Sequence, residues 1–87
     1  MKLDFSHFFE FLSAEVQVVV DCHVADISRN PRLVIDNVLD STGKVSLLHS
    51  DDKLMADIGF RIADLAEDDT KLLARAVAQD NDERRAA

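Results

Sequence analysis

The sequence of this chain has few of the residues that supply special chemistry or interrupt secondary structure. Its 87 residues include one cysteine, one proline and two glycines. A single thiol, Cys22, excludes an intrachain disulfide and fits a reducing compartment. The two glycines lie far apart, which excludes a glycine-rich phosphate loop. No run approaches the roughly 18 apolar residues of a membrane span, and Asp4, His7 and Glu10 interrupt any signal-peptide core. We therefore expect a cytoplasmic protein.

Basic side chains are also scarce, because 10 lysines and arginines face 17 acids, for a formal net charge of −7. Such a surface repels phosphates, so we expect no direct nucleic-acid binding. It favours either plain solubility or a partner protein with a basic surface. Hydrophobic residues make up 47% of the chain, as in a folded protein. We expect one domain over residues 1–80 and a frayed polar tail over residues 81–87.

The clearest pattern is the alternation from Glu15 to Ile27, which predicts a long β-strand. One parity of this stretch holds Val16, Val18, Val20, Cys22 and Val24. Alternation sustained in β-branched residues is typical of strands. Turns at residues 28–31 and 41–43 then predict a second strand from Arg32 to Asp40 and a third from Lys44 to His49.

Helices are predicted on both sides of these strands. Near the N-terminus, a short Phe-rich helix is predicted over residues 5–14, with Asp4 as its N-cap. Its apolar residues Phe5, Phe8, Phe9 and Leu12 lie at helical spacing. After the strands, apolar residues recur at helical spacing from Leu54 to Ala66 and again over 70–79, as one continuous helix or two. The expected fold class is α+β: an N-terminal helix, a three-stranded antiparallel meander, and one or two C-terminal helices packed on one sheet face (αβββα or αβββαα).

Strand register decides which polar side chains meet. Closing the first turn between Ile27 and Arg32 opposes Cys22 to Asn37 and His23 to Asp36. With Ser46 one strand further, His23 and Asp36 resemble part of a catalytic triad. A flat sheet face offers no pocket and no oxyanion donors, so we interpret them as a cross-strand charged pair.

No metal, cofactor or catalytic site is predicted. The three histidines and Cys22 lack metal-binding spacing, and Cys22 and His23 point to opposite faces of their strand. We therefore expect no cofactor and no enzymatic activity.

Two surfaces remain as candidates for partner binding. The outer sheet face combines apolar and acidic residues: Val19, Asp21, His23, Val34, Asp36, Val38, Asp40 and Leu48. Either the Phe-rich helix covers this face, or a partner or second copy does. An acidic corner is formed by Asp64, Glu67, Asp68 and Asp69. These acids either cap helices and solvate the surface, or imitate the phosphates of a nucleic acid.

The expected order of elements resembles two known layouts. The order αβββα is that of double-stranded-RNA-binding domains, but Asp51 and Asp52 stand where phosphate-binding lysines are required. Small size, acidity and the order αβββαα are similar to those of some phage-encoded inhibitors, including certain anti-CRISPR proteins. That likeness implies inhibition by nucleic-acid mimicry.

The leading hypothesis is a small, acidic, non-enzymatic inhibitor or adaptor that occupies a basic site on a partner protein, such as a nucleic-acid-binding site. The alternative is a structural homodimer, joined through the outer sheet face or through the edge of the strand from Glu15 to Ile27. An enzyme is the third hypothesis, and it would require a deep pocket around His23 and Asp36.

Overall fold

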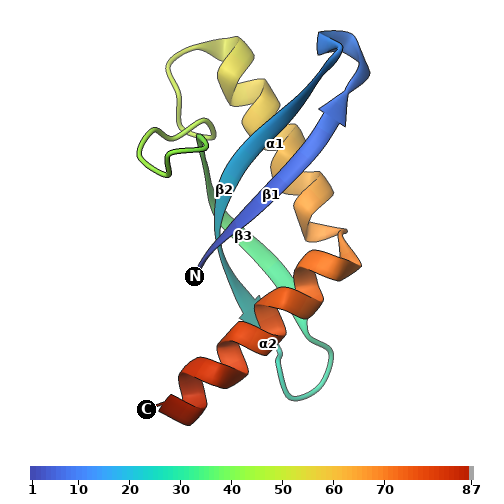
Figure 1. Cartoon of the computed structure of the whole chain (residues 1–87), viewed down its shortest axis with the longest axis vertical. Coiled ribbons are helices and arrows are strands. Elements are labelled where there is room, and N and C mark those ends of the chain that lie inside the picture. The colour runs from blue at the N-terminus through green and yellow to red at the C-terminus, as the bar shows by residue number, and fades with distance from the viewer. Residues whose placement is uncertain (87) are drawn as a thin grey trace.

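The computed structural model describes residues 1–86 and shows an α+β fold, with a three-stranded antiparallel sheet and two helices (Figure 1). The elements are β1 (Lys2–Phe9), a short 3-10 helix η1 (Glu10–Leu12), β2 (Ala14–Ala25), β3 (Arg32–Leu39), α1 (Lys53–Glu67) and α2 (Thr70–Ala86). The strand order is β1-β2-β3. No helix in this described part is long and apolar enough to cross a membrane.

The N-terminal segment is a strand, which corrects the prediction of a helix over residues 5–14. Phe5, His7 and Phe9 alternate with more exposed residues, and β1 pairs with β2 along its whole length. Ser13 closes the hairpin in the left-handed region, with φ of 49°. Because β2 offers this segment a full ladder of hydrogen bonds, pairing prevails over the helical spacing of its phenylalanines.

The valine-rich segment is β2, as its alternation predicts. Val18, Val20 and Cys22 are buried, whereas Gln17 and His23 are exposed. However, β2 lies at the centre of the sheet and pairs on both sides. Its edges are therefore not available to a second copy, which corrects that version of the homodimer hypothesis.

A β-bulge sets the register between β2 and β3. Cys22 faces Ile35 and Asp21 faces Asn37, so Asp36 has no partner across the ladder. From Cys22 to Ala25 the observed pairing differs from the expected register by two residues, a slip that keeps inward and outward positions unchanged. From Val19 to Asp21 it differs by one residue. Beyond the bulge the parity reverses. Val38 therefore faces the core with no exposed surface, which corrects its assignment to the outer face.

A loop takes the place of the predicted third strand over residues 44–49, whose only ladder contact is an isolated bridge between Leu39 and Ser46. The carboxylate of Asp40 organises this loop by accepting hydrogen bonds from the Thr42 hydroxyl and from the Thr42 and Lys44 amides. The bond from the Thr42 hydroxyl holds the pKa of Asp40 below its ordinary value. Side-chain bonding thus competes with strand pairing here.

Two separate helices cover the sheet, so the region 52–79 is not one continuous helix. The Asp52 carboxylate caps α1 by accepting the amide of Leu54, and the Asp69 carboxylate accepts the amides of Lys71 and Leu72 at the start of α2. The core joins buried residues of the sheet to five from the helices: Ile58, Ile62, Ala66, Leu72 and Ala76. Residues 81–86, expected as a polar tail, continue α2, and residue 87 lies outside the described residues.

The observed order is βββαα, with a short 3-10 turn after the first strand. Both layout resemblances depended on an N-terminal helix. The order of elements therefore supports neither the RNA-binding-domain layout nor that of the phage inhibitors.

Candidate partner-binding surfaces

The exposed side of α1 carries a ridge of carboxylates formed by Asp57, Asp64 and Asp68, all of them exposed. Residues at these spacings share one side of a helix, about 10 Å and 6 Å apart along its axis. Asp57 accepts a hydrogen bond from Arg61 Nε at 3.0 Å. Asp64 and Asp68 form no ion pair with any residue that the structure describes. The ridge therefore presents negative charge that is only partly compensated.

Exposed apolar side chains flank this acidic ridge. Phe60 is 61% exposed and lies three residues after Asp57 and four before Asp64, so it is next to both on the helix surface. Leu54 and Leu65, 55% and 38% exposed, lie on the other flank. Aromatic residues surrounded by polar ones are typical of the centres of protein interfaces. Phe60, Leu54 and Leu65 do not belong to the hydrophobic core, so they are available for contact with a partner.

Arg61 connects α1 to the hairpin that joins β1 and β2. Its guanidinium carbon lies 5.2 Å from the centre of the Phe11 ring, within the range of a cation–π contact. Phe11 in turn meets the buried Phe9 edge to face at 5.5 Å. The position of Arg61, and hence its pairing with Asp57, is therefore fixed from two elements.

The four acids of the predicted acidic corner have different roles. Asp64 and Asp68 belong to the ridge. Glu67 Oε2 accepts the amide of Ile35 at 3.3 Å, so it covers a backbone group at the free edge of β3. Asp69 is the cap of α2. Two of the four acids thus have structural contacts, and the other two are directed to solvent.

The outer sheet face is more polar than the sequence predicts. Val38 packs in the core, and Leu48, also expected on this face, packs against the core from the loop. Val19 lies beneath the loop, because a Cβ at Gly43 would be 3.9 Å from its side chain. Val34 remains half-buried among polar neighbours. The apolar patch proposed for this face is therefore absent.

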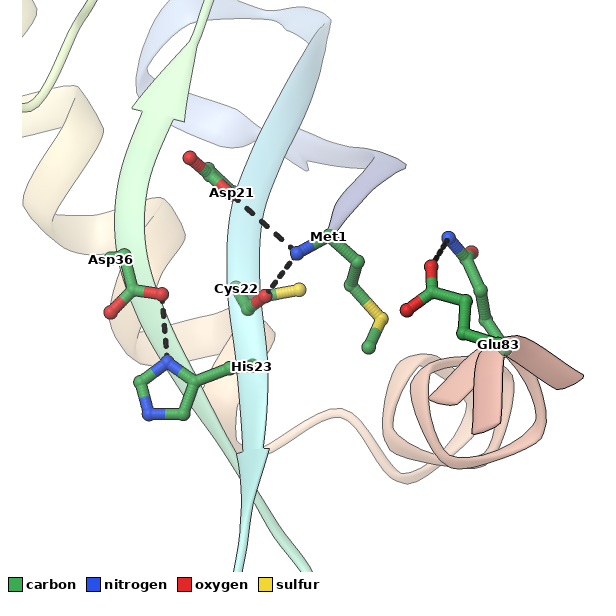
Figure 2. Close-up of polar contacts among 7 residues, drawn as sticks. Met1, Asp21, Cys22, His23, Asp36 and Glu83 are labelled. Carbon is green, nitrogen blue, oxygen red and sulfur yellow. Dashed lines mark hydrogen bonds and ion pairs between the residues drawn. The ribbon is translucent and has the colours of Figure 1, made fainter. Parts of the chain in front are cut away.

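Figure 2 shows the polar pair that does form on this face. His23 Nδ1 and Asp36 Oδ2 are 2.7 Å apart, and both side chains are about half exposed. The bulge brings them together, although His23 itself faces Val34 across the ladder. Ser46 does not join this pair, and its hydroxyl instead donates a hydrogen bond to Asn37 Oδ1 at 2.7 Å. Of the other acids expected on this face, Asp21 has its Oδ1 atom 3.7 Å from the Met1 amine. Asp40 accepts hydrogen bonds within the loop that follows β3.

An open hollow of about 390 Å³ lies elsewhere, beside Asp4, Ser6, Gln17 and Ser41. Asp4 is its single ionisable side chain, whereas acid–base chemistry on carboxylates uses a pair with separated pKa values. Within residues 1–86, no group of three or more histidine, cysteine or acidic side chains is placed to hold a metal ion.

Comparison with protein-family models, with curated proteins and with solved structures gives no match to this chain. The assignment of function therefore depends on the surfaces themselves.

Sequence reasoning missed the exposed apolar residues of α1. Phe60 stands between Asp57 and Asp64, opposite the predicted apolar stripe, and a large ring at that position was a readable signal. The Phe11–Arg61 contact was not readable, because it depends on a hairpin that the helical interpretation of residues 5–14 removed.

Proposed function

We propose that this chain is a small, non-enzymatic protein-binding module that uses the exposed side of α1 to occupy a basic, partly apolar site on a partner protein. The observation that carries this proposal is the acidic ridge of α1 flanked by exposed Phe60, Leu54 and Leu65. A helix with this pattern fits a groove that offers apolar pockets and basic side chains together. Inhibitor or adaptor is the role that such binding would serve.

Charge and apolar surface contribute differently to this binding. The net charge of −7 attracts a basic surface over long range and accelerates encounter. Burial of Phe60 in a pocket would supply the short-range affinity, because interface hot spots are rich in aromatic residues. Both contributions come from the same side of α1, so substitutions there should weaken binding without affecting the core.

Affinity capture from lysate of the source cell tests this proposal. The tagged protein is compared with three variants: Asp64→Asn/Asp68→Asn, Phe60→Ser, and the control Glu15→Gln/Asp82→Asn. The two double variants change the net charge equally, from −7 to −5, but the control acids lie on β2 and α2. We expect a partner that the first two variants lose and the control retains.

The affinity of that complex is then measured by titration at several salt concentrations. We expect its Kd to rise at least about tenfold between ~50 and ~500 mM NaCl, because salt screens the attraction. A Kd that is the same at all salt concentrations would show that the ridge of α1 is not the binding surface. Equal loss of the partner by the two double variants would show the same.

A further inference from the structure

The two free edges of the sheet differ in how their outward backbone groups are engaged. At the β3 edge, Glu67 accepts the amide of Ile35, and α1 packs along the strand. At the β1 edge, the one hydrogen bond found among the described residues runs from Arg75 Nη1 to the carbonyl of Asp4, at 3.0 Å. An open edge is a template for another strand, so β1 is the edge that can still pair.

The ladder between β1 and β2 identifies the backbone groups that point outward. Met1 and Cys22 exchange two hydrogen bonds, of 2.7 and 2.8 Å. Because such pairs alternate along an antiparallel ladder, Leu3, Phe5 and His7 bond to β2. The even-numbered residues Lys2, Asp4, Ser6 and Phe8 then turn their N–H and C=O groups away from it. These groups form a continuous row along the edge.

We propose that this row pairs antiparallel with β1 of a second copy of the chain, with the two-fold axis at Phe5. Two three-stranded sheets would thereby become one continuous sheet. In this register Asp4 faces Ser6 of the second copy, Lys2 faces Phe8, Leu3 faces His7, and the two Phe5 rings meet on the axis. A second copy of the chain is the partner that we propose for this edge, because β1 is complementary to itself in this register.

Charge and exposure favour this register. Lys2 approaches the Phe8 ring, which is 57% exposed in the single chain, and a cation on an aromatic face is attractive. Asp4 meets a hydroxyl. Sliding the pair by one repeat so that Asp4 meets Asp4 would oppose like charges directly, which destabilises a sheet. The half-buried Phe5 and His7 would also gain cover at the edge.

Sedimentation equilibrium with matched variants tests the proposal. Ser6→Pro removes an outward N–H that the single chain does not use, and proline is tolerated at strand edges. Ser6→Ala keeps the N–H and is the control. We expect the wild type and Ser6→Ala to dimerise, and the Kd of Ser6→Pro to be at least tenfold higher, where tenfold corresponds to ~1.4 kcal/mol. A wild type that remains monomeric up to the highest soluble concentration overturns the proposal, as does a Ser6→Pro dimer of unchanged affinity.

Cysteine cross-linking tests the register and does not depend on the proline variant folding. Directly opposite residues have Cβ atoms about 4.5–5.5 Å apart, so Phe5→Cys should form an intermolecular disulfide on oxidation. His7→Cys is the control, since its two copies would be about 13 Å apart along the strands. The native Cys22 is fully buried and should not compete. Equal cross-linking of both variants, or of neither, rejects the axis at Phe5.

Salt distinguishes this dimer from binding to a basic partner. Two chains of charge −7 repel one another, so the Kd of the dimer should fall between ~50 and ~500 mM NaCl. The Kd of the complex with a basic partner protein should rise over the same range. Arg75→Ala removes the side chain that bonds to the carbonyl of Asp4 at this edge and should lower the dimer Kd several-fold. A higher Kd for Arg75→Ala would contradict the competition between Arg75 and the second strand.

Discussion

Gly59 sets how closely α1 approaches the rest of the molecule. A Cβ at this position would lie 2.9 Å from both Cα and N of Leu48, and 3.0 Å from the carbonyl carbon of Leu47. Those atoms are backbone and cannot turn aside as a flexible side chain would. The glycine therefore allows the helix to rest directly on the loop that follows β3, although glycine is a poor helix former.

Gly59→Ala should lower the free energy of unfolding by about 1–2 kcal/mol, measured by urea denaturation. Alanine would gain ~1 kcal/mol of helix propensity. Overpacking costs typically ~1–3 kcal/mol, and we expect ~2–3 kcal/mol here because the atoms in the way belong to the backbone. Gly43→Asn is the control, since asparagine tolerates the φ of 75° and the nearest atom is 3.9 Å away. A variant as stable as the wild type would show that the loop yields easily.

Cys22 combines complete burial with a titratable thiol. Burial raises the pKa of this thiol above its ordinary value of 9.0. The folded state therefore keeps the proton at pH values where the unfolded state loses it. The sign follows: this contribution to stability is complete below the ordinary pKa and is lost as the pH rises above it.

Native Cys22 should resist a thiol reagent such as DTNB at pH 8. The reactive species is the thiolate, which here is both disfavoured and inaccessible. We expect labelling in native buffer to be at least ~100-fold slower than in denaturing urea, and to follow the rate of opening. Instant labelling of the native protein would place the thiol at the surface.

At the scale of elements, the two helices are separated by a pair of aspartates with different roles. The Asp69 carboxylate accepts the amides of Lys71 and Leu72, at 2.9 and 3.0 Å. Asp68 ends α1, and its own amide bonds to the preceding turn. Neighbouring residues of the same type thus provide an internal comparison.

Asp69→Ala should destabilise the protein by about 0.5–2 kcal/mol, the usual effect of losing an N-cap. Asp68→Ala should change stability by less than ~0.5 kcal/mol, as is typical of surface positions. Thermal unfolding of both variants measures the difference. Equal effects would mean that loss of negative charge, rather than loss of the cap, controls stability here.

The elements also show where sequence patterns suffice and where they do not. The strand β2 and the two helices could be predicted from the sequence, because the burial of each follows a single period, two residues for the strand and 3.6 for the helices. Residues 5–9 satisfy two periods, since Phe5, Phe8 and Phe9 fit a helix while Phe5, His7 and Phe9 fit a strand. Pairing with β2 decides between the two structures in favour of a strand. The bulge at Asp36 leaves no local signal and moves Val38 into the core.

On the scale of the whole molecule, both helices contribute to the core on the inner side of the sheet, and the outer side carries the exposed His23–Asp36 pair. The acidity of the chain and its acidic corner were predictable from composition. The division of those acids was not, because Glu67 and Asp69 are engaged by backbone amides that only the folded chain brings near. The recognition surface that we propose therefore lies on the side of α1 that carries Phe60, and not on the sheet.

The fully buried part of the cover over the sheet comes from the two helices, between Ile58 and Ala76. During synthesis the strands leave the ribosome first, and their hairpins can form from neighbouring segments alone. Until the helices follow, the valines and leucines of the inner face have nothing to pack against. We expect the nascent chain to be most vulnerable to aggregation, and most in need of a chaperone, in the interval after Leu39 has emerged and before Ala76 has.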